Sequence, residues 1–133
     1  MDSTGQSVYV GGAFTNVHDG YGQICANHVA QWIPDPYFWG DWATLGSGVN
    51  DTAYALAVSG TQVYVGGDFT VAGGTPSSRI AQWDSGTSKW LWLGRGAHHT
   101  VRAIAVGSDY LYIGGDFALA GGAPVNGIAR WKR

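Results

Sequence analysis

The chain has 133 residues, of which 45% are hydrophobic and 12% are charged, with a formal net charge of −2 at pH 7. This much apolar content excludes a disordered chain, and the charge gives no field for collecting nucleic acid or an anionic membrane. All nine acidic residues are aspartates and only two residues are lysines, so residues that favour surface helices are scarce. We expect a single β-rich domain whose partners include neither nucleic acid nor a membrane.

The first apolar segment of the chain returns twice. VYVGGAF starts at Val8, VYVGGDF at Val63 and LYIGGDF at Leu111, at spacings of 55 and 48 residues. A second segment follows each copy and ends in tryptophan: VAQW at Trp32, IAQW at Trp83 and IARW at Trp131. Self-similarity at a nearly fixed period indicates a repeat architecture.

Two more segments complete the repeat. WATLGSG from Trp42 returns as WLWLGRG from Trp90, and AYALAV at 53–58 returns as VRAIAV at 101–106. All four types are short apolar or alternating runs bounded by turn-forming residues, which is typical of β-strands. If the AYALAV type is strand a, VYVGG strand b, VAQW strand c and WxxLG strand d, the chain order is b c d, a b c d, a b c.

Small residues mark the edges of these strands. In strand a, alanines alternate with Leu, Ile or Val, so one face lets another backbone approach closely. Gly-Gly pairs end strand b, and the AGG segments at Ala72 and Ala120 predict turns with a positive φ at glycine. Asp68 and Asp116, which follow Gly-Gly, are interpreted as turn caps.

Four short strands in about 48 residues match the size of one propeller blade. The segments YVGGDFTVAGG, IAQWD and WLWLG resemble the GGDF-type, kelch-like β-propeller repeats of bacterial surface proteins and fungal cell-polarity proteins. The resemblance covers roughly residues 7–131. It implies an all-β partial β-propeller of about 2.5 to 3 four-stranded blades in a single unit, 1–133, with repeats at approximately 7–52, 53–100 and 101–133. It favours an extracellular or cell-surface protein, although the opening residues contain no signal-peptide pattern, so the location stays open.

The loops differ most between repeats. In an up-and-down sheet the b-to-c and d-to-a connections emerge on one side, where we expect a recognition surface. Its candidate ligand-binding residues are His18, Asp19 and Tyr21 from the longer first b-to-c loop, and Asn50, Asp51, His98 and His99 from the d-to-a loops. The alternative is that these loops vary because nothing constrains them.

No catalytic, metal-binding or cofactor-binding pattern is apparent. Neighbouring histidines in an extended segment project to opposite sides, and no further ligand follows at a zinc spacing. There is no nucleophile elbow, P-loop or HExxH motif. We therefore expect a non-enzymatic, self-assembling structural or interaction scaffold without a cofactor, with a protein or glycan as ligand. The alternative is an oligomeric carbohydrate-binding propeller, a lectin, which seven Trp and seven Tyr residues favour.

The repeat arithmetic also predicts self-association. The first set of strands lacks strand a and the last lacks strand d, so an open arc would expose apolar sheet faces and unpaired edges. Two chains would give a ring of about five or six blades, within the usual range of four to eight. We expect a homo-oligomer and favour a dimer.

Overall fold

The computed structural model is all-β, as the sequence predicts. It describes residues 7–18, 22–35, 40–93, 96–116, 119–120, 123–124 and 127–132. The secondary structure of these ranges consists of β-strands without a helix. Accordingly, the described part of the chain has no helix that could span a membrane.

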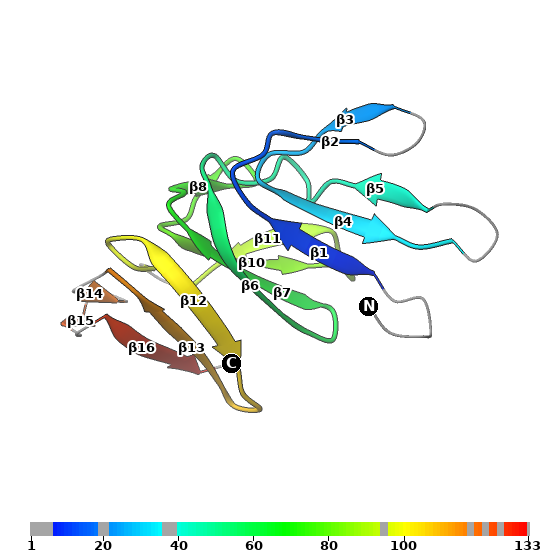
Figure 1. Cartoon of the computed structure of the whole chain (residues 1–133). Coiled ribbons are helices and arrows are strands. Elements are labelled where there is room, and N and C mark those ends of the chain that lie inside the picture. Colours follow the sequence, from blue (N-terminus) through cyan, green and yellow to red (C-terminus); the bar gives the residue numbers. More distant parts are fainter. Residues whose placement is uncertain are drawn as a thin grey trace.

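Three antiparallel sheets contain the repeated segments and lie side by side (Figure 1). The first sheet comprises β1 (Val8–Gly11), β4 (Val29–Ile33) and β5 (Asp41–Ala43). The second comprises β6 (Ala53–Ser59), β7 (Gln62–Gly67), β10 (Ile80–Asp84) and β11 (Lys89–Trp92). The third comprises β12 (Val101–Val106), β13 (Tyr110–Gly115) and β16 (Ile128–Lys132). The predicted strand order b c d, a b c d, a b c is confirmed.

A short hairpin between strands b and c recurs in each repeat and was not expected from the sequence. The hairpins are β2 (Asn16–His18) with β3 (Gln23–Cys25), β8 (Val71–Ala72) with β9 (Thr75–Pro76), and β14 (Leu119–Ala120) with β15 (Ala123–Pro124). Between β8 and β9, Gly73 and Gly74 have φ of 59° and 80°. Two consecutive positive φ angles are what a two-residue type I′ hairpin turn requires. The predicted positive φ at this glycine pair is thus confirmed.

Hydrophobic cores fill the spaces between neighbouring sheets. The first core packs Tyr9 and Val29 of the first sheet with Val63, Val65 and Trp83 of the second sheet and with Phe69, which follows β7. The second core packs Tyr64 and Ile80 of the second sheet with residues of the third, namely Val101, Ile104, Leu111, Ile113 and Trp131. The second sheet therefore packs one face against the first sheet and the other against the third.

The second glycine of two of the Gly-Gly pairs lets strand a cross close to strand b. A Cβ atom at Gly67 would overlap the carbonyl oxygen of Thr52, and one at Gly115 would overlap that of Thr100. Neither glycine has a positive φ. Close approach of backbone, rather than a left-handed conformation, explains why these positions are glycine.

The residue before strand c has a left-handed backbone in all three repeats. His28, Arg79 and Gly127 have φ of 68°, 62° and 74°. Their carbonyl oxygens accept hydrogen bonds from the N–H groups of Gly12, Gly67 and Gly115 at 2.9–3.0 Å. This conformation connects the hairpin to strand c, and two of the three repeats adopt it without a glycine.

Candidate functional site

A d-to-a connection and a b-to-c hairpin meet on one side of the molecule, as predicted. Val49, which follows the first sheet, forms an antiparallel bridge with Ala72 of β8. The Asn50 N–H donates to the Val71 carbonyl oxygen at 3.1 Å. In return, Asn50 Oδ1 accepts hydrogen bonds from the N–H groups of Thr70 (2.8 Å) and Val71 (2.9 Å). The side chain of Asn50 thus holds the two connections together.

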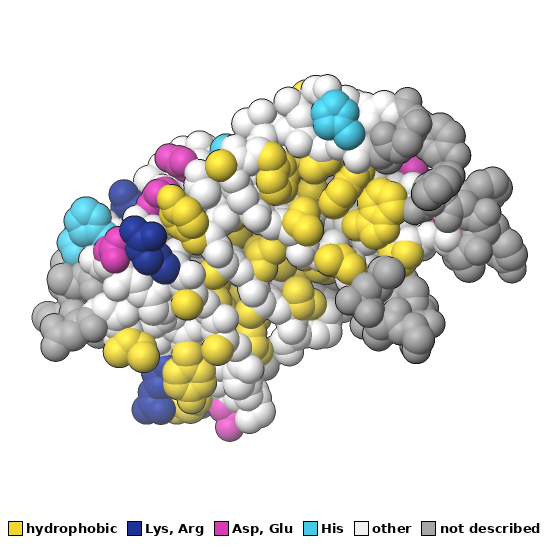
Figure 2. All heavy atoms as spheres, in the orientation of Figure 1, with side chains coloured by type: hydrophobic (Ala, Val, Ile, Leu, Met, Phe, Trp, Pro, Cys, Tyr) yellow, Lys and Arg dark blue, Asp and Glu magenta, His cyan; other side chains and the backbone are white. Residues whose placement is uncertain are grey.

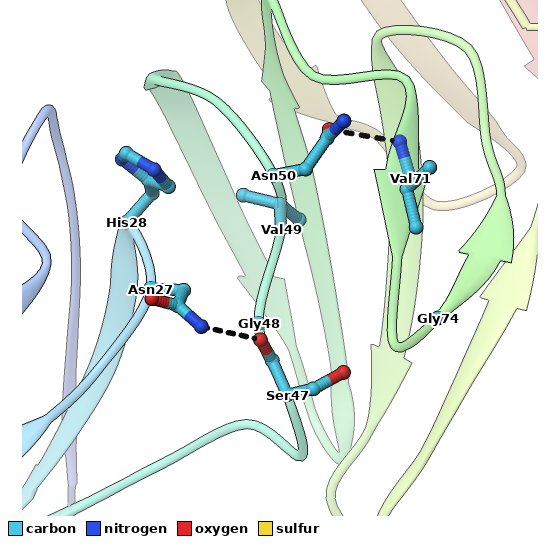
Figure 3. A pocket seen from close by; sticks show the side chains of 8 residues that line it. All are labelled: Asn27, His28, Ser47, Gly48, Val49, Asn50, Val71 and Gly74. Atoms are coloured by element: carbon cyan, nitrogen blue, oxygen red, sulfur yellow. Dashed lines mark hydrogen bonds between the residues drawn. The ribbon is translucent and has the colours of Figure 1, made fainter.

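A pocket of about 340 Å³ lies beside this junction (Figure 3). It is lined by Asn27, His28, Ser47, Gly48, Val49, Asn50, Val71 and Gly74. Asn27 Nδ2 donates to the Ser47 carbonyl oxygen at 3.1 Å, and the Asn27 carbonyl oxygen accepts the Val49 N–H at 3.2 Å. These contacts attach residues 47–50 to the loop before β4.

The pocket retains one polar atom without a described partner. His28 Nδ1 is buried and forms no hydrogen bond with another described residue. The eight lining residues contain this single imidazole and no carboxylate, thiol, Trp or Tyr. The pocket can therefore offer hydrogen bonds to a small polar molecule, but it lacks the aromatic platform that sugars stack against.

Most of the predicted ligand-binding residues do not converge on the pocket. His18 lies in β2 with an exposed side chain, and its carbonyl oxygen accepts the Trp42 Nε1–H at 2.9 Å. Asp51 is exposed and its carboxylate accepts the Thr52 N–H at 2.7 Å. Asp19 and Tyr21 lie outside the described residues. Of the residues that can be placed, only Asn50 lines the pocket.

The expectation that the two adjacent histidines project to opposite sides is wrong. The rings of His98 and His99 lie with their centroids 4.5 Å apart in an edge-to-face arrangement, and both are exposed. They do not project to opposite sides, because this segment is a bend rather than an extended strand. The histidine side chains visible in Figure 2 are spread along one side of the molecule. In the ranges given above, no three His, Cys, Asp or Glu side chains gather as metal ligands would.

The aspartates after Gly-Gly bind neighbouring side chains. Asp68 accepts hydrogen bonds from Tyr54 Oη at 3.2 Å and from the hydroxyl of Thr100 in the following repeat. Asp116 accepts two hydrogen bonds from Arg102, at 2.8 and 2.9 Å. The capping interpretation of Asp68 is therefore wrong. For Asp116 it stays a prediction, because the next two residues lie outside the described residues.

These polar pairs arise from a repeated irregularity in strand a. The pairing register shifts at Tyr54 in β6 and at Arg102 in β12, the same position of the repeat. The hydrogen bonds from Arg102 lower the pKa of Asp116, whereas the hydrogen bond to Asp68 raises the pKa of Tyr54. Because Tyr54, Arg102 and Asp116 are well exposed, solvent screens their interactions.

The outer face of the third sheet exposes apolar positions that are buried in the second. Ile80 is 0% exposed and pairs with Gly66, whereas Ile128, which pairs with Gly114, is 68% exposed. Likewise, Tyr64 is 4% exposed and its counterpart Tyr112 is 42% exposed. A hollow of about 220 Å³ lies beside Tyr112 and Ile128. We call this surface the C-terminal face.

The outer face of the first sheet shows the complementary pattern. Val63, Val65 and Trp83 of the second sheet, and Phe69 in the connection after β7, are buried against the first sheet. Their counterparts in the first repeat are only half-buried, and these are Val8, Val10, Phe14 and Trp32. Figure 2 shows hydrophobic side chains gathered over the first sheet. We call this surface the N-terminal face.

No family model matches the chain, and a search of curated proteins finds no match either. The resemblance to kelch-like repeats therefore stays a prediction. Because the sheets repeat, the two outer faces can be compared position by position with the filled interfaces between neighbouring sheets.

Proposed function

We propose that this chain is a non-enzymatic interaction module whose sheets act as propeller blades and which assembles head to tail with further copies of itself. The observation that carries the proposal is the exposure of Ile128 at a position where Ile80 is completely buried. Repeat proteins bury their apolar faces through contacts between neighbouring repeats, so an uncovered face of this kind calls for a further neighbour.

The two faces are the two halves of an interface that the chain already contains. Between the first and second sheets, Tyr9 and Val29 pack on the set containing Val63 and Trp83. Tyr112 and Ile128 occupy the positions of Tyr9 and Val29 on the C-terminal face. Val8 and Trp32 occupy those of Val63 and Trp83 on the N-terminal face.

The C-terminal face of one copy therefore suits the N-terminal face of the next. A contact between different faces is heterologous, and such contacts produce either a closed ring or an open filament. With three sheets in each copy, a dimer closes a ring of about six blades, within the range that propellers use. Closure as a dimer is the simplest assembly that leaves neither face exposed.

The lectin alternative has less support. Two of the aromatic residues outside the repeat pattern lie under arginines. The Cζ atom of Arg102 is 5.6 Å from the ring centroid of Tyr54, and that of Arg130 is 4.3 Å from the ring centroid of Tyr110. Cationic side chains thus cover part of these rings, and neither ring lines the pocket beside Asn50. A glycan array with a reproducible, dose-dependent hit would favour the lectin.

The test is a pair of charge substitutions on exposed apolar residues. Ile128→Asp introduces a charge into the C-terminal face and should convert the assembly to monomer. Leu91→Asp is the matched control, because Leu91 is 44% exposed but belongs to the outermost strand of the middle sheet. Sedimentation velocity should show the monomer for the first variant only. Equal sedimentation of both variants with the parent would contradict the proposal.

A further inference from the structure

The edge of β1 that faces away from β4 carries no neighbouring strand among the described residues, whereas the matching strands of the other two sheets have one there. In the second sheet β6 pairs with β7, and in the third β12 pairs with β13. β1 is the counterpart of β7 and β13, but it pairs only with β4 among the described strands. An unpaired strand edge is a template for an additional strand.

The backbone groups on this edge can be identified. The Gly12 N–H donates to the His28 carbonyl oxygen at 3.0 Å, on the β4 side. Because successive residues of a strand direct their N–H and C=O groups to opposite edges, Tyr9 and Gly11 direct theirs away from β4. In the second sheet the matching residues, Tyr64 and Gly66, pair with Ala57 and Ala55 of β6.

A side chain beside this edge gives a second, independent indication. Val106 of β12 packs against the core between the second and third sheets. Its counterpart in β6, Val58, lies on the face of β6 that looks toward the first sheet, as does Leu56 two residues earlier. Leu56 packs against the first core, but Val58 is 50% exposed. The face of β6 is therefore covered at one end only.

We propose that the edge of β1 accepts an extended polypeptide segment of the strand a type, with the pattern Ala-x-Ala-Leu/Ile-Ala-Val, from another chain. This inference rests on the proposed interaction function and names one partner for it. The two filled copies of the site define the occupant, since β6 (AYALAVS) has this pattern and β12 (VRAIAV) shares its last four positions, Ala-Leu/Ile-Ala-Val.

The alternation in the pattern has a physical reason at this site. The alanines of the incoming strand would face β6, where Val58 and Leu56 leave little room for a longer side chain. Its Leu/Ile and Val residues would face the other way and extend the apolar N-terminal face beside Val8 and Val10. Paired antiparallel, the Ala-Leu-Ala-Val run would lie opposite Gly11, Val10, Tyr9 and Val8, as in the second sheet.

The experiment uses a labelled peptide, AYALAVS with a solubilising Lys-Lys tail, titrated into the full chain and followed by fluorescence anisotropy. Its matched control is AYKLKVS with the same tail, in which lysines replace the second and third alanines. We expect saturable binding of the first peptide and at least tenfold weaker binding of the second. Equal binding of both peptides, or of neither, would overturn the inference.

Hydrogen exchange locates the peptide on the chain. Bound AYALAVS should protect the N–H groups of Tyr9 and Gly11, whereas those of Val8 and Val10 already face β4 and should change little. Protection elsewhere without this alternation would contradict the assigned edge.

A covalent fusion makes the test possible even if the free peptide binds weakly. The same segment fused to the N-terminus through a Gly/Ser linker has an effective concentration in the mM range. It should raise Tm relative to a fusion of AYKLKVS, and equal Tm values would also overturn the inference.

Two variants separate this inference from head-to-tail assembly. Val58→Lys places a charge beside the β1 edge and should weaken peptide binding at least tenfold without changing the C-terminal face. Tyr112→Lys alters that face and should reduce self-association but leave peptide binding as it is. Assembly that persists when no peptide binds would refute the strand-acceptor site alone.

Discussion

Ile80 and Ile128 occupy the same position of consecutive sheets, yet Ile80 is completely buried and Ile128 is 68% exposed. Ile80 packs against the third sheet, whereas no described residue packs on Ile128 in the same way. The difference arises from neighbours rather than from sequence, since both are isoleucine at the start of strand c. Burying a side chain of this size contributes about 1.5–3 kcal/mol, which makes the C-terminal face favourable to cover.

Gly67→Val should be among the most destabilising substitutions in the chain. Its Cβ would overlap the Thr52 carbonyl oxygen, and backbone cannot move aside as a flexible side chain can. We expect a loss of about 3 kcal/mol, which lowers Tm by about 10 °C. Gly22→Val is the control, because nothing lies within 4 Å of a Cβ placed there. Calorimetry that found similar Tm values for the two variants would contradict the close approach of strands a and b.

Arg79→Gly should stabilise the chain. Arg79 has a φ of 62°, which costs a residue with a side chain about 1–2 kcal/mol, and glycine recovers part of this after its own entropic cost. The third repeat already has Gly127 at this position, with a φ of 74°. We expect a gain of about 0.5–1 kcal/mol in urea unfolding. Lower stability of the variant would show that the Arg79 side chain contributes more than the strain costs.

Asn50→Ala should destabilise the chain although the residue is exposed. The substitution removes the acceptor of the Thr70 and Val71 N–H groups, at a cost of about 1–2 kcal/mol. Replacing His98 and His99 together by Ser should change stability by less than about 0.5 kcal/mol, because both rings are exposed and contact each other. Thermal melts of both variants make the comparison. The reverse order of effects would mean that the histidines, not Asn50, secure the d-to-a connections.

The ion pair between Arg102 and Asp116 should make the stability of the folded chain fall slightly at acidic pH. Arg102 lowers the pKa of Asp116, so the folded state favours the carboxylate. This contribution is present above the unfolded pKa of about 3.9 and is lost as pH falls through the lower folded value. An NMR titration of Arg102→Gln should show the pKa of Asp116 moving upward. An unchanged pKa would mean that Arg102 is not its cause.

The strands were predictable because each repeated segment carries its own local pattern, an apolar run ended by Gly-Gly or by Trp. The small hairpins were not, since strands of two residues such as β8 leave no period to detect. The left-handed residues His28 and Arg79 have side chains that do not favour this conformation. Only their alignment with Gly127 gives a signal.

The candidate site was less predictable for a related reason. The role of Asn50 depends on Thr70 and Val71, which lie about twenty residues further along the chain, and no local motif joins them. The exposure of Ile128 and Val58 follows from which sheet neighbours each repeat, information that lies in the strand order b c d, a b c d, a b c. That order is visible in the sequence and predicts self-association, but it does not single out these side chains.

Head-to-tail assembly is tested most directly by the mass of the chain in solution. Light scattering coupled to gel filtration at micromolar concentration, with a reducing agent because Cys25 is an exposed free thiol, measures it without a variant. The account predicts a folded species of about twice the 14.0 kDa chain mass, or a larger multiple if the ring closes with more copies. A folded, soluble species of 14.0 kDa would contradict it.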